Sequence, residues 1–269
     1  MSYPRAELWD NGMKMNKKLI VGNMKMNPVS PIEADRYLNM LEKELSNKDF
    51  SKTEVVVCPP VIFLDRFVSR KLKLVKLGSQ DAFWERNGAF TGEVSAAMVK
   101  STGGSYVIVG HSERRHYFNE NDSIIALKLK AAFKNGLKAI LCVGETEEEK
   151  KRDQIANVLK RQLKNSLKEI NQAKLDYLSI AYEPVWAIGT NRTPTSDEIL
   201  EAKLLIKKTL AEMYGQRYMN KIRILYGGSV KSNLVVQTCL DPAMDGVLVG
   251  RESLMPYEFL KIAELVDEN

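Results

Sequence analysis

Three side chains that could move a proton or contact an anion, Lys25, His111 and Glu183, each lie just beyond a short apolar run. A carboxylate that ends an apolar run is costly to bury, so Glu183 is expected to have a chemical role. His111 precedes Ser112, which can begin a helix, and a helix N-terminus disfavours the imidazolium and leaves a neutral hydrogen-bond donor. Taken singly, Lys25 is more often an exposed loop lysine, and His111 more often a structural histidine.

Glycines follow two later apolar runs, in Gly227-Gly228-Ser229 and in Gly250-Arg251. Glycines let backbone N–H groups approach an anion closely, so these segments are candidates for binding phosphate. The loop after Glu183 begins with apolar residues and contains Gly189, which suits a lid that excludes water, although a plain connection is the alternative. A carboxylate can take a proton from carbon next to a carbonyl, and a hydrogen-bond donor can stabilise the enediolate. Together, the carboxylate, the histidine, the lysine and the glycine segments favour aldose–ketose isomerisation of a sugar phosphate.

Neither a metal nor a redox cofactor is expected. The two histidines of the chain, His111 and His116, have no carboxylates or thiolates at metal-ligand spacing. His116 is interpreted as a surface or structural residue. No GxGxxG segment follows an apolar run, which removes the simplest case for a dinucleotide site.

Short β-branched runs alternate eight times with segments of helical period, and these runs are the predicted strands. They are Leu19–Gly22, Glu54–Cys58, Val75–Ser79, Tyr106–Val109, Lys138–Val143, Leu178–Tyr182, Ile222–Leu225 and Gly246–Val249. Helices are predicted over Ile32–Leu45, Ser123–Phe133 and Ile199–Tyr214, and the charged segment Glu147–Asn171 is predicted to be one long outer helix.

Strict alternation predicts parallel strands joined by right-handed crossovers. Eight such units can close, so the expected fold class is α/β, a single (β/α)8 barrel over residues 19–269, preceded by an N-terminal extension over 1–18. Active sites of such barrels form at the C-terminal ends of the strands. The candidate residues named above all follow predicted strands at that end.

Composition is that of an ordinary globular protein, with 44% hydrophobic residues and a net charge of +6. The charge favours anionic partners, but it is scattered along the chain, so nucleic-acid binding is not expected. No apolar run approaches the roughly 20 residues that cross a bilayer, so no membrane association is expected. Three cysteines without CxxC spacing predict buried free thiols, and the first 18 residues lack a signal-peptide core, which together predict a cytoplasmic protein.

The chain resembles the triosephosphate isomerase family from about Leu19 to Val266. The matching segments are Val21–Asn27, Gln80–Glu93, Tyr106–Arg115, Ala139–Thr146, Ala181–Thr190, Tyr226–Val230 and Asp245–Gly250. The resemblance implies a TIM barrel that interconverts the triose phosphates dihydroxyacetone phosphate and D-glyceraldehyde 3-phosphate through an enediolate, without a cofactor, in glycolysis and gluconeogenesis.

The resemblance also implies roles for individual residues. Glu183 would be the base, His111 the neutral electrophile, and Lys25, beside Asn23 and paired with Glu113, would stabilise negative charge. Backbone N–H groups of the phosphate site would come from Gly189, Ser229, Gly250 and Arg251. Pro184–Trp186 and Arg192–Pro194 would be the hinges of a lid.

Three segments depart from the family pattern. Met24 replaces a tryptophan, which changes packing alone, and Asn191-Arg192 replaces glycine-lysine, which could alter the flexibility of the lid. Arg251 replaces a glycine, so we expect an ordinary negative φ there or an ion pair for the guanidinium. We favour an ion pair with Glu252 or Glu113 over contact with the substrate phosphate.

The resemblance implies a homodimer. The loop Asp81–Glu93 is expected to insert into a second subunit, with Thr91 reaching the Asn23–His111 region of that subunit, whereas residues 1–15 are expected to make few core contacts. Two other functions stay open: another phosphate-binding barrel, such as a lyase or synthase, and an inactive barrel that binds a partner.

Overall fold

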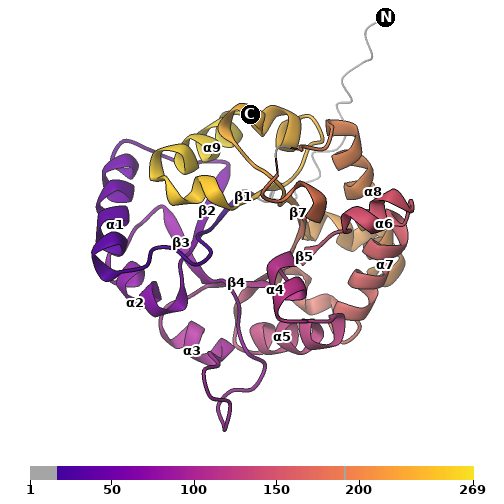
Figure 1. Ribbon diagram of the computed structural model, residues 1–269, viewed down its shortest axis with the longest axis horizontal. Helices are drawn as coiled ribbons and strands as arrows, with labels where there is room; N and C mark the ends of the chain where they lie inside the picture. The colour runs from indigo at the N-terminus through magenta and orange to yellow at the C-terminus, as the bar shows by residue number, and fades with distance from the viewer. Residues whose placement is uncertain (1–16, 191) are drawn as a thin grey trace, which may run out of the picture.

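The computed structural model describes residues 17–190 and 192–269, so Asn191 and most of the predicted N-terminal extension lie outside the described residues. Within them, eight parallel strands pair in sequence order, and β8 pairs with β1 to close a barrel (Figure 1). The strands are β1 Lys18–Asn23, β2 Thr53–Cys58, β3 Val75–Ser79, β4 Tyr106–Val109, β5 Lys138–Val143, β6 Leu178–Tyr182, β7 Arg223–Tyr226 and β8 Gly246–Val249. The predicted barrel is confirmed, with strand bounds that shift by at most one residue.

Helices surround the barrel (Figure 1). They are α1 Pro31–Leu45, α2 Val61–Ser69, α3 Ala96–Ser101, α4 Ser112–Tyr117, α5 Asp122–Lys134, α6 Glu147–Lys151, α7 Ile155–Ser166, α8 Ser196–Tyr214 and α9 Pro256–Glu268. Their starts follow capping chemistry: the side chain of Ser30 accepts the Glu33 N–H at the start of α1, and Thr195 forms a capping box with Glu198 at the start of α8. Among the described residues, no helix is both long enough and apolar enough to span a bilayer.

The prediction of one helix over Glu147–Asn171 is wrong. The segment forms two helices, α6 and α7, because Asp153 between them has a φ of 55°, in the left-handed region that ends a right-handed helix. The highly charged α6 has no buried residue, whereas α7 turns Val158, Leu159 and Leu163 into the core. The periodic apolar positions therefore belong to the second helix alone.

The strands are buried on both faces, which gives the protein two apolar layers. One lies inside the barrel and consists of Leu19, Val21, Val56, Cys58, Tyr106, Ile108, Ile140, Cys142, Ala181, Leu225 and Leu248. The larger layer lies between the sheet and the helices. The three cysteines are free and buried, as predicted, and burial raises the pKa of Cys239 to about 11, so this thiol is not activated.

Candidate active site

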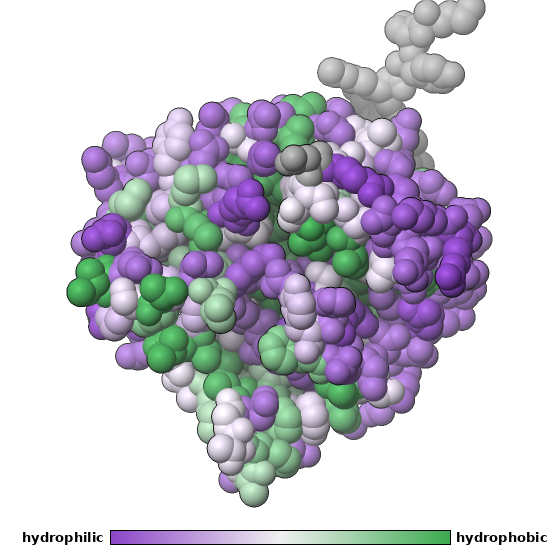
Figure 2. Space-filling model, viewed as in Figure 1, coloured by the Kyte–Doolittle hydropathy of each residue, from purple (hydrophilic) through white to green (hydrophobic). Residues whose placement is uncertain are grey.

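A cavity of about 420 Å³ opens at the C-terminal ends of the strands. This is the end of the barrel on which α4 lies in Figure 1, and Figure 2 shows it as a hollow near the centre of the face. The fold brings together seven of the eight predicted site residues in its lining: Asn23, Lys25, His111, Gly189, Ser229, Gly250 and Arg251. The eighth, Glu183, is 1% exposed and lies behind His111.

Lys25 is held in a specific conformation beyond the end of β1. Its φ is 52°, and its backbone N–H donates to Asn23 Oδ1 over 3.0 Å. Its ammonium forms an ion pair with Glu113, as the family resemblance implied. Gly250 lies beside this lysine, since a Cβ at that position would be 3.4 Å from Lys25 Cε, an ordinary van der Waals contact.

His111 is the N-cap of α4. Its Nδ1 accepts the backbone N–H of Glu113 over 3.2 Å, which assigns the ring proton to Nε2 in a neutral imidazole. Nε2 lies 3.4 Å from Glu183 Oε1. The helix start thus fixes both the tautomer and the direction of the donor, in agreement with the sequence interpretation.

Glu183 is a buried carboxylate with spare acceptor capacity. Its Oε2 accepts the N–H of Ser112 over 3.0 Å, whereas its buried Oε1 has no hydrogen-bond partner among the described residues. A Cβ on Gly227 would lie 2.9 Å from Glu183 Cγ, so this glycine gives space to the carboxylate as well as to an anion. An unsatisfied carboxylate oxygen is costly to bury, which agrees with the chemical role that we expect of Glu183.

Sequence reasoning did not single out Glu145, which is fully buried two residues after β5. Its Oε1 accepts the indole N–H of Trp186 over 2.7 Å and the hydroxyl of Tyr182 over 3.1 Å. Burial raises the pKa of this carboxyl, opposed by the hydrogen bond from Trp186. Glu145 therefore anchors the loop that follows Glu183, and the rule that identified Glu183, an acid just beyond an apolar strand, also applies to it.

The loop that follows Glu183 is also hydrogen-bonded to the loop that follows β7. The hydroxyl of Ser229 donates to the carbonyl of Ala187 over 2.7 Å. Arg192 pairs with Glu147 over 2.8 Å, and its guanidinium lies 5.0 Å from the Trp186 ring centroid. The family's glycine-lysine pair is thus replaced by an arginine that contacts α6.

Arg251 differs in part from what the sequence suggested. It begins a short 3₁₀ turn and is not among the described non-glycine residues with positive φ, so the expected negative φ is confirmed. The preferred ion pair is wrong, because Glu113 pairs with Lys25 and no ion pair joins Arg251 to a described acid. The exposed Arg251 lies at the cavity instead.

The fold and this cavity define a class of protein, the (β/α)8-barrel enzymes, whose active sites lie at the C-terminal ends of their strands. The described residues contain no cluster of three or more side chains suited to a metal ion. The groups positioned for chemistry are a carboxylate, a neutral imidazole and an ammonium.

Sequence and structure comparisons identify the family within this class. Residues 18–266 match the family model for triosephosphate isomerase. The triosephosphate isomerase of Thermodesulfovibrio yellowstonii is 44% identical over 93% of this chain and 100% of its own length, and that of Clostridium novyi is 42% identical over 92% and 98%. The crystal structure of the Bartonella henselae enzyme superposes with a TM-score of 0.83 at 35% identity, covering 94% of this chain and 100% of that one. The chain belongs to the triosephosphate isomerase family.

Proposed function

We propose that this chain interconverts dihydroxyacetone phosphate and D-glyceraldehyde 3-phosphate. One observation carries the proposal: the unpaired Oε1 of Glu183 lies 3.4 Å from His111 Nε2, beside a cavity that Lys25 also lines. A base and a hydrogen-bond donor at this spacing can act on adjacent carbons of one small substrate.

In the proposed reaction, the carboxylate of Glu183 turns from Ser112 toward the cavity and removes a proton from the carbon next to the carbonyl. The Nε2–H of His111 donates to the carbonyl oxygen, and the ammonium of Lys25 stabilises the charge of the resulting enediolate. Glu183 then returns the proton to the neighbouring carbon, while His111 passes its Nε2 proton to the former carbonyl oxygen and takes up the proton of the neighbouring hydroxyl, so no atom is gained or lost. Backbone N–H groups at Gly189, Ser229, Gly250 and Arg251 hold the phosphate.

The direct test is a coupled assay of triose phosphate interconversion with purified protein and no added metal or cofactor. We expect turnover that persists after dialysis against a chelator, because the proposed groups supply the whole proton transfer. Absence of turnover in both directions would favour a lyase, a synthase or an inactive binding barrel.

Arg251 is proposed to contact the substrate phosphate through its side chain as well as its backbone. We expect Arg251→Gln to raise KM about three- to tenfold, equivalent to about 0.6–1.4 kcal/mol, with kcat nearly unchanged. The effect should shrink at high salt, because an exposed guanidinium is screened. An unchanged KM at low ionic strength would limit the contribution of Arg251 to its backbone.

The loop between β3 and α3 is proposed to form a homodimer contact. Residues 85–93 are all exposed, and the loop projects at the lower edge of Figure 1. It carries the half-exposed Phe90, which packs on Phe83, and Met26, next to Lys25, is 86% exposed. A second subunit would cover such apolar groups, and Thr91 lies in this loop.

We therefore expect a dimer by light scattering, and we expect Thr91→Arg to give a monomer with at least tenfold lower activity. Gln154→Arg, which places the same side chain at an exposed position between α6 and α7, is the matched control and should stay dimeric. A fully active wild-type monomer would contradict this contact.

A cytoplasmic location is also proposed, supported by the three free thiols.

A further inference from the structure

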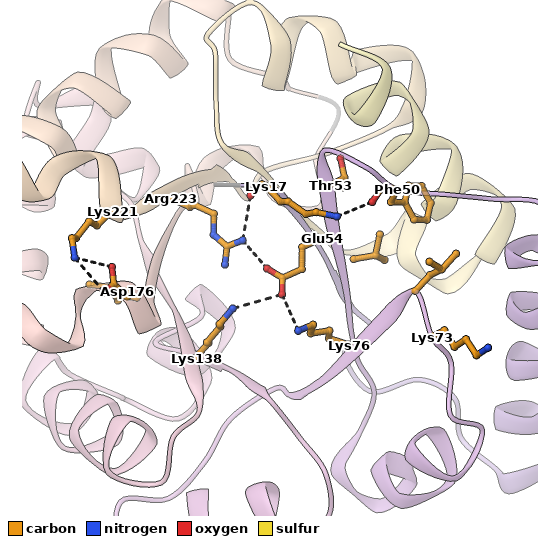
Figure 3. A pocket seen from close by; sticks show the side chains of 13 residues that line it. Lys17, Phe50, Thr53, Glu54, Lys73, Lys76, Lys138, Asp176, Lys221 and Arg223 are labelled. Atoms are coloured by element: carbon orange, nitrogen blue, oxygen red, sulfur yellow. Dashed lines mark hydrogen bonds and ion pairs between the residues drawn. The ribbon is translucent and has the colours of Figure 1, made fainter. Parts of the chain in front are cut away.

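A second cavity, of about 510 Å³, lies at the opposite end of the barrel, where the strands begin. Its lining contains six basic and two acidic side chains, so positive charge exceeds negative by four (Figure 3). The basic residues are Lys17, Lys73, Lys76, Lys138, Lys221 and Arg223. The substrate cavity at the other end shares none of these residues.

Glu54, near the start of β2, is the acid at the centre of this cavity (Figure 3). Its Oε2 lies 2.8 Å from Arg223 Nη1, and its Oε1 lies 3.6 Å from Lys76 Nζ and 3.7 Å from Lys138 Nζ. Arg223 is further held by the hydroxyl of Tyr106 over 3.1 Å. One carboxylate thus faces three cations that come from three other strand starts.

The two lysines near Glu54 keep unused donors. Separations of 3.6 and 3.7 Å exceed hydrogen-bond length, so neither ammonium is hydrogen-bonded to the carboxylate. Lys138 donates to the Tyr106 hydroxyl over 3.3 Å, which leaves two of its three protons. Burial lowers the pKa of Lys138, Glu54 opposes this, and Arg223 and Lys76 add to it. A further anion would relieve that repulsion.

The other acid does not balance the remaining charge. Asp176 pairs with Lys221 over 3.2 Å at one side of the cavity, apart from Glu54 (Figure 3). Lys73, at the other side, has no ion pair with any described residue. Because Glu54 offsets one of the three positive charges that face it, an excess of two positive charges remains in the cluster of Arg223, Lys76 and Lys138.

We propose that this cavity binds a small polyanion, a metabolite with two phosphate groups or with a phosphate and a carboxylate, at a site separate from the substrate cavity. Lys76 and Lys138 would together contact one anionic group of the ligand. Their ammonium groups are near each other, because both lie close to the same oxygen of Glu54, at 3.6 and 3.7 Å. The volume is within the range of about 300–1,000 Å³ typical of small-molecule sites. Leu74, which is half-buried in the lining, offers apolar surface to the carbon skeleton of such a ligand.

The test is a calorimetric titration of the full chain with inorganic pyrophosphate as the probe. We expect binding in the wild type that weakens at least tenfold in Lys76→Gln/Lys138→Gln, a variant that keeps the Arg223–Glu54 pair. Lys134→Gln/Lys168→Gln removes the same charge from exposed positions on the outer helical layer, outside both cavities, and should bind like the wild type. Any pyrophosphate bound in the substrate cavity is common to all of these proteins.

A second variant separates a binding site from a cluster that serves stability alone. Glu54→Gln removes the carboxylate that competes for the two lysines, so it should tighten pyrophosphate binding at least threefold. Lys76→Gln alone, at a 56% exposed side chain, provides a readout if the double variant does not fold. Equal affinity in the wild type and the lysine variants, or no gain in Glu54→Gln, would overturn the proposal and leave the cluster a stabilising network.

Discussion

Glu183→Gln should lower turnover by at least about 10²–10⁴-fold while leaving phosphate binding largely intact. The amide preserves the shape of the side chain and can still accept the N–H of Ser112, but it has lost the base. Ser229, Gly250 and Arg251, which are proposed to hold phosphate, lie in other loops, and Gly189 is six residues beyond Glu183, so the geometry of the phosphate site is retained. The measurement is kcat in the coupled assay, together with calorimetric affinity for inorganic phosphate.

Glu252→Gln is the matched control, because Glu252 is a carboxylate in the lining of the same cavity without a proposed role in proton transfer. We expect its kcat to stay within threefold of the wild type. The melting temperature should also distinguish a catalytic from a structural role of Glu183. Glu183→Gln removes a buried charge with an unsatisfied oxygen, so it should not lower the melting temperature. Near-normal turnover in folded Glu183→Gln would contradict the assignment of the base.

The barrel and the location of its chemistry could be predicted because they depend on short-range patterns. Each strand is a brief β-branched run buried on both faces, and the parallel connections place every strand end on one rim. His111 and Glu183 follow such strands directly, so their meeting at 3.4 Å follows from the topology. The orientation of Lys25 could not be predicted in this way, because it depends on a positive φ at a residue that is not glycine.

Other features depend on contacts between segments distant in sequence. Gly227 gives space to the Glu183 side chain as well as to an anion. The sequence could not indicate this role, because it depends on the pairing of β6 with β7. The guanidinium of Arg251 faces a cavity rather than an acid because Glu113 is already paired with Lys25. The high charge of the segment after Glu147 led to a prediction of one helix across Asp153, where the backbone conformation ends α6.

A buried charge network around Lys128 is a further feature that the sequence pattern did not indicate. This lysine lies on the inward face of a helix, where apolar residues are expected. Lys128 in α5 is 3% exposed, and its ammonium lies 2.7 Å from both carboxylate oxygens of Asp81 and 2.5 Å from Glu120 Oε1. Arg114 in α4 contacts the same two acids, over 2.9 and 2.6 Å. The network joins the loop after β3 to α4, the helix that positions His111.

Lys128→Met should therefore destabilise the protein by about 3–5 kcal/mol at pH 7, because it leaves two buried carboxylates facing one guanidinium. Methionine fills a similar volume, so the loss should report charge rather than a cavity. Lys130→Met on the same helix is the matched control: its ammonium is exposed and pairs with the exposed Glu169, so little change is expected. The measurement is urea unfolding at a fixed protein concentration.

The pH dependence of this loss gives a sharper test than its size. Burial raises the pKa of Asp81 even in the wild type, against the pull of Lys128. Removing the cation raises the pKa of Asp81 further. A carboxyl whose pKa is higher in the folded than in the unfolded state stabilises the folded protein most at low pH, and this contribution is lost as pH rises through the folded pKa. The destabilisation by Lys128→Met should therefore be smaller at pH 5 than at pH 7. A loss that is equal at both pH values would show that packing, and not the charge of Lys128, holds α4 and α5 together.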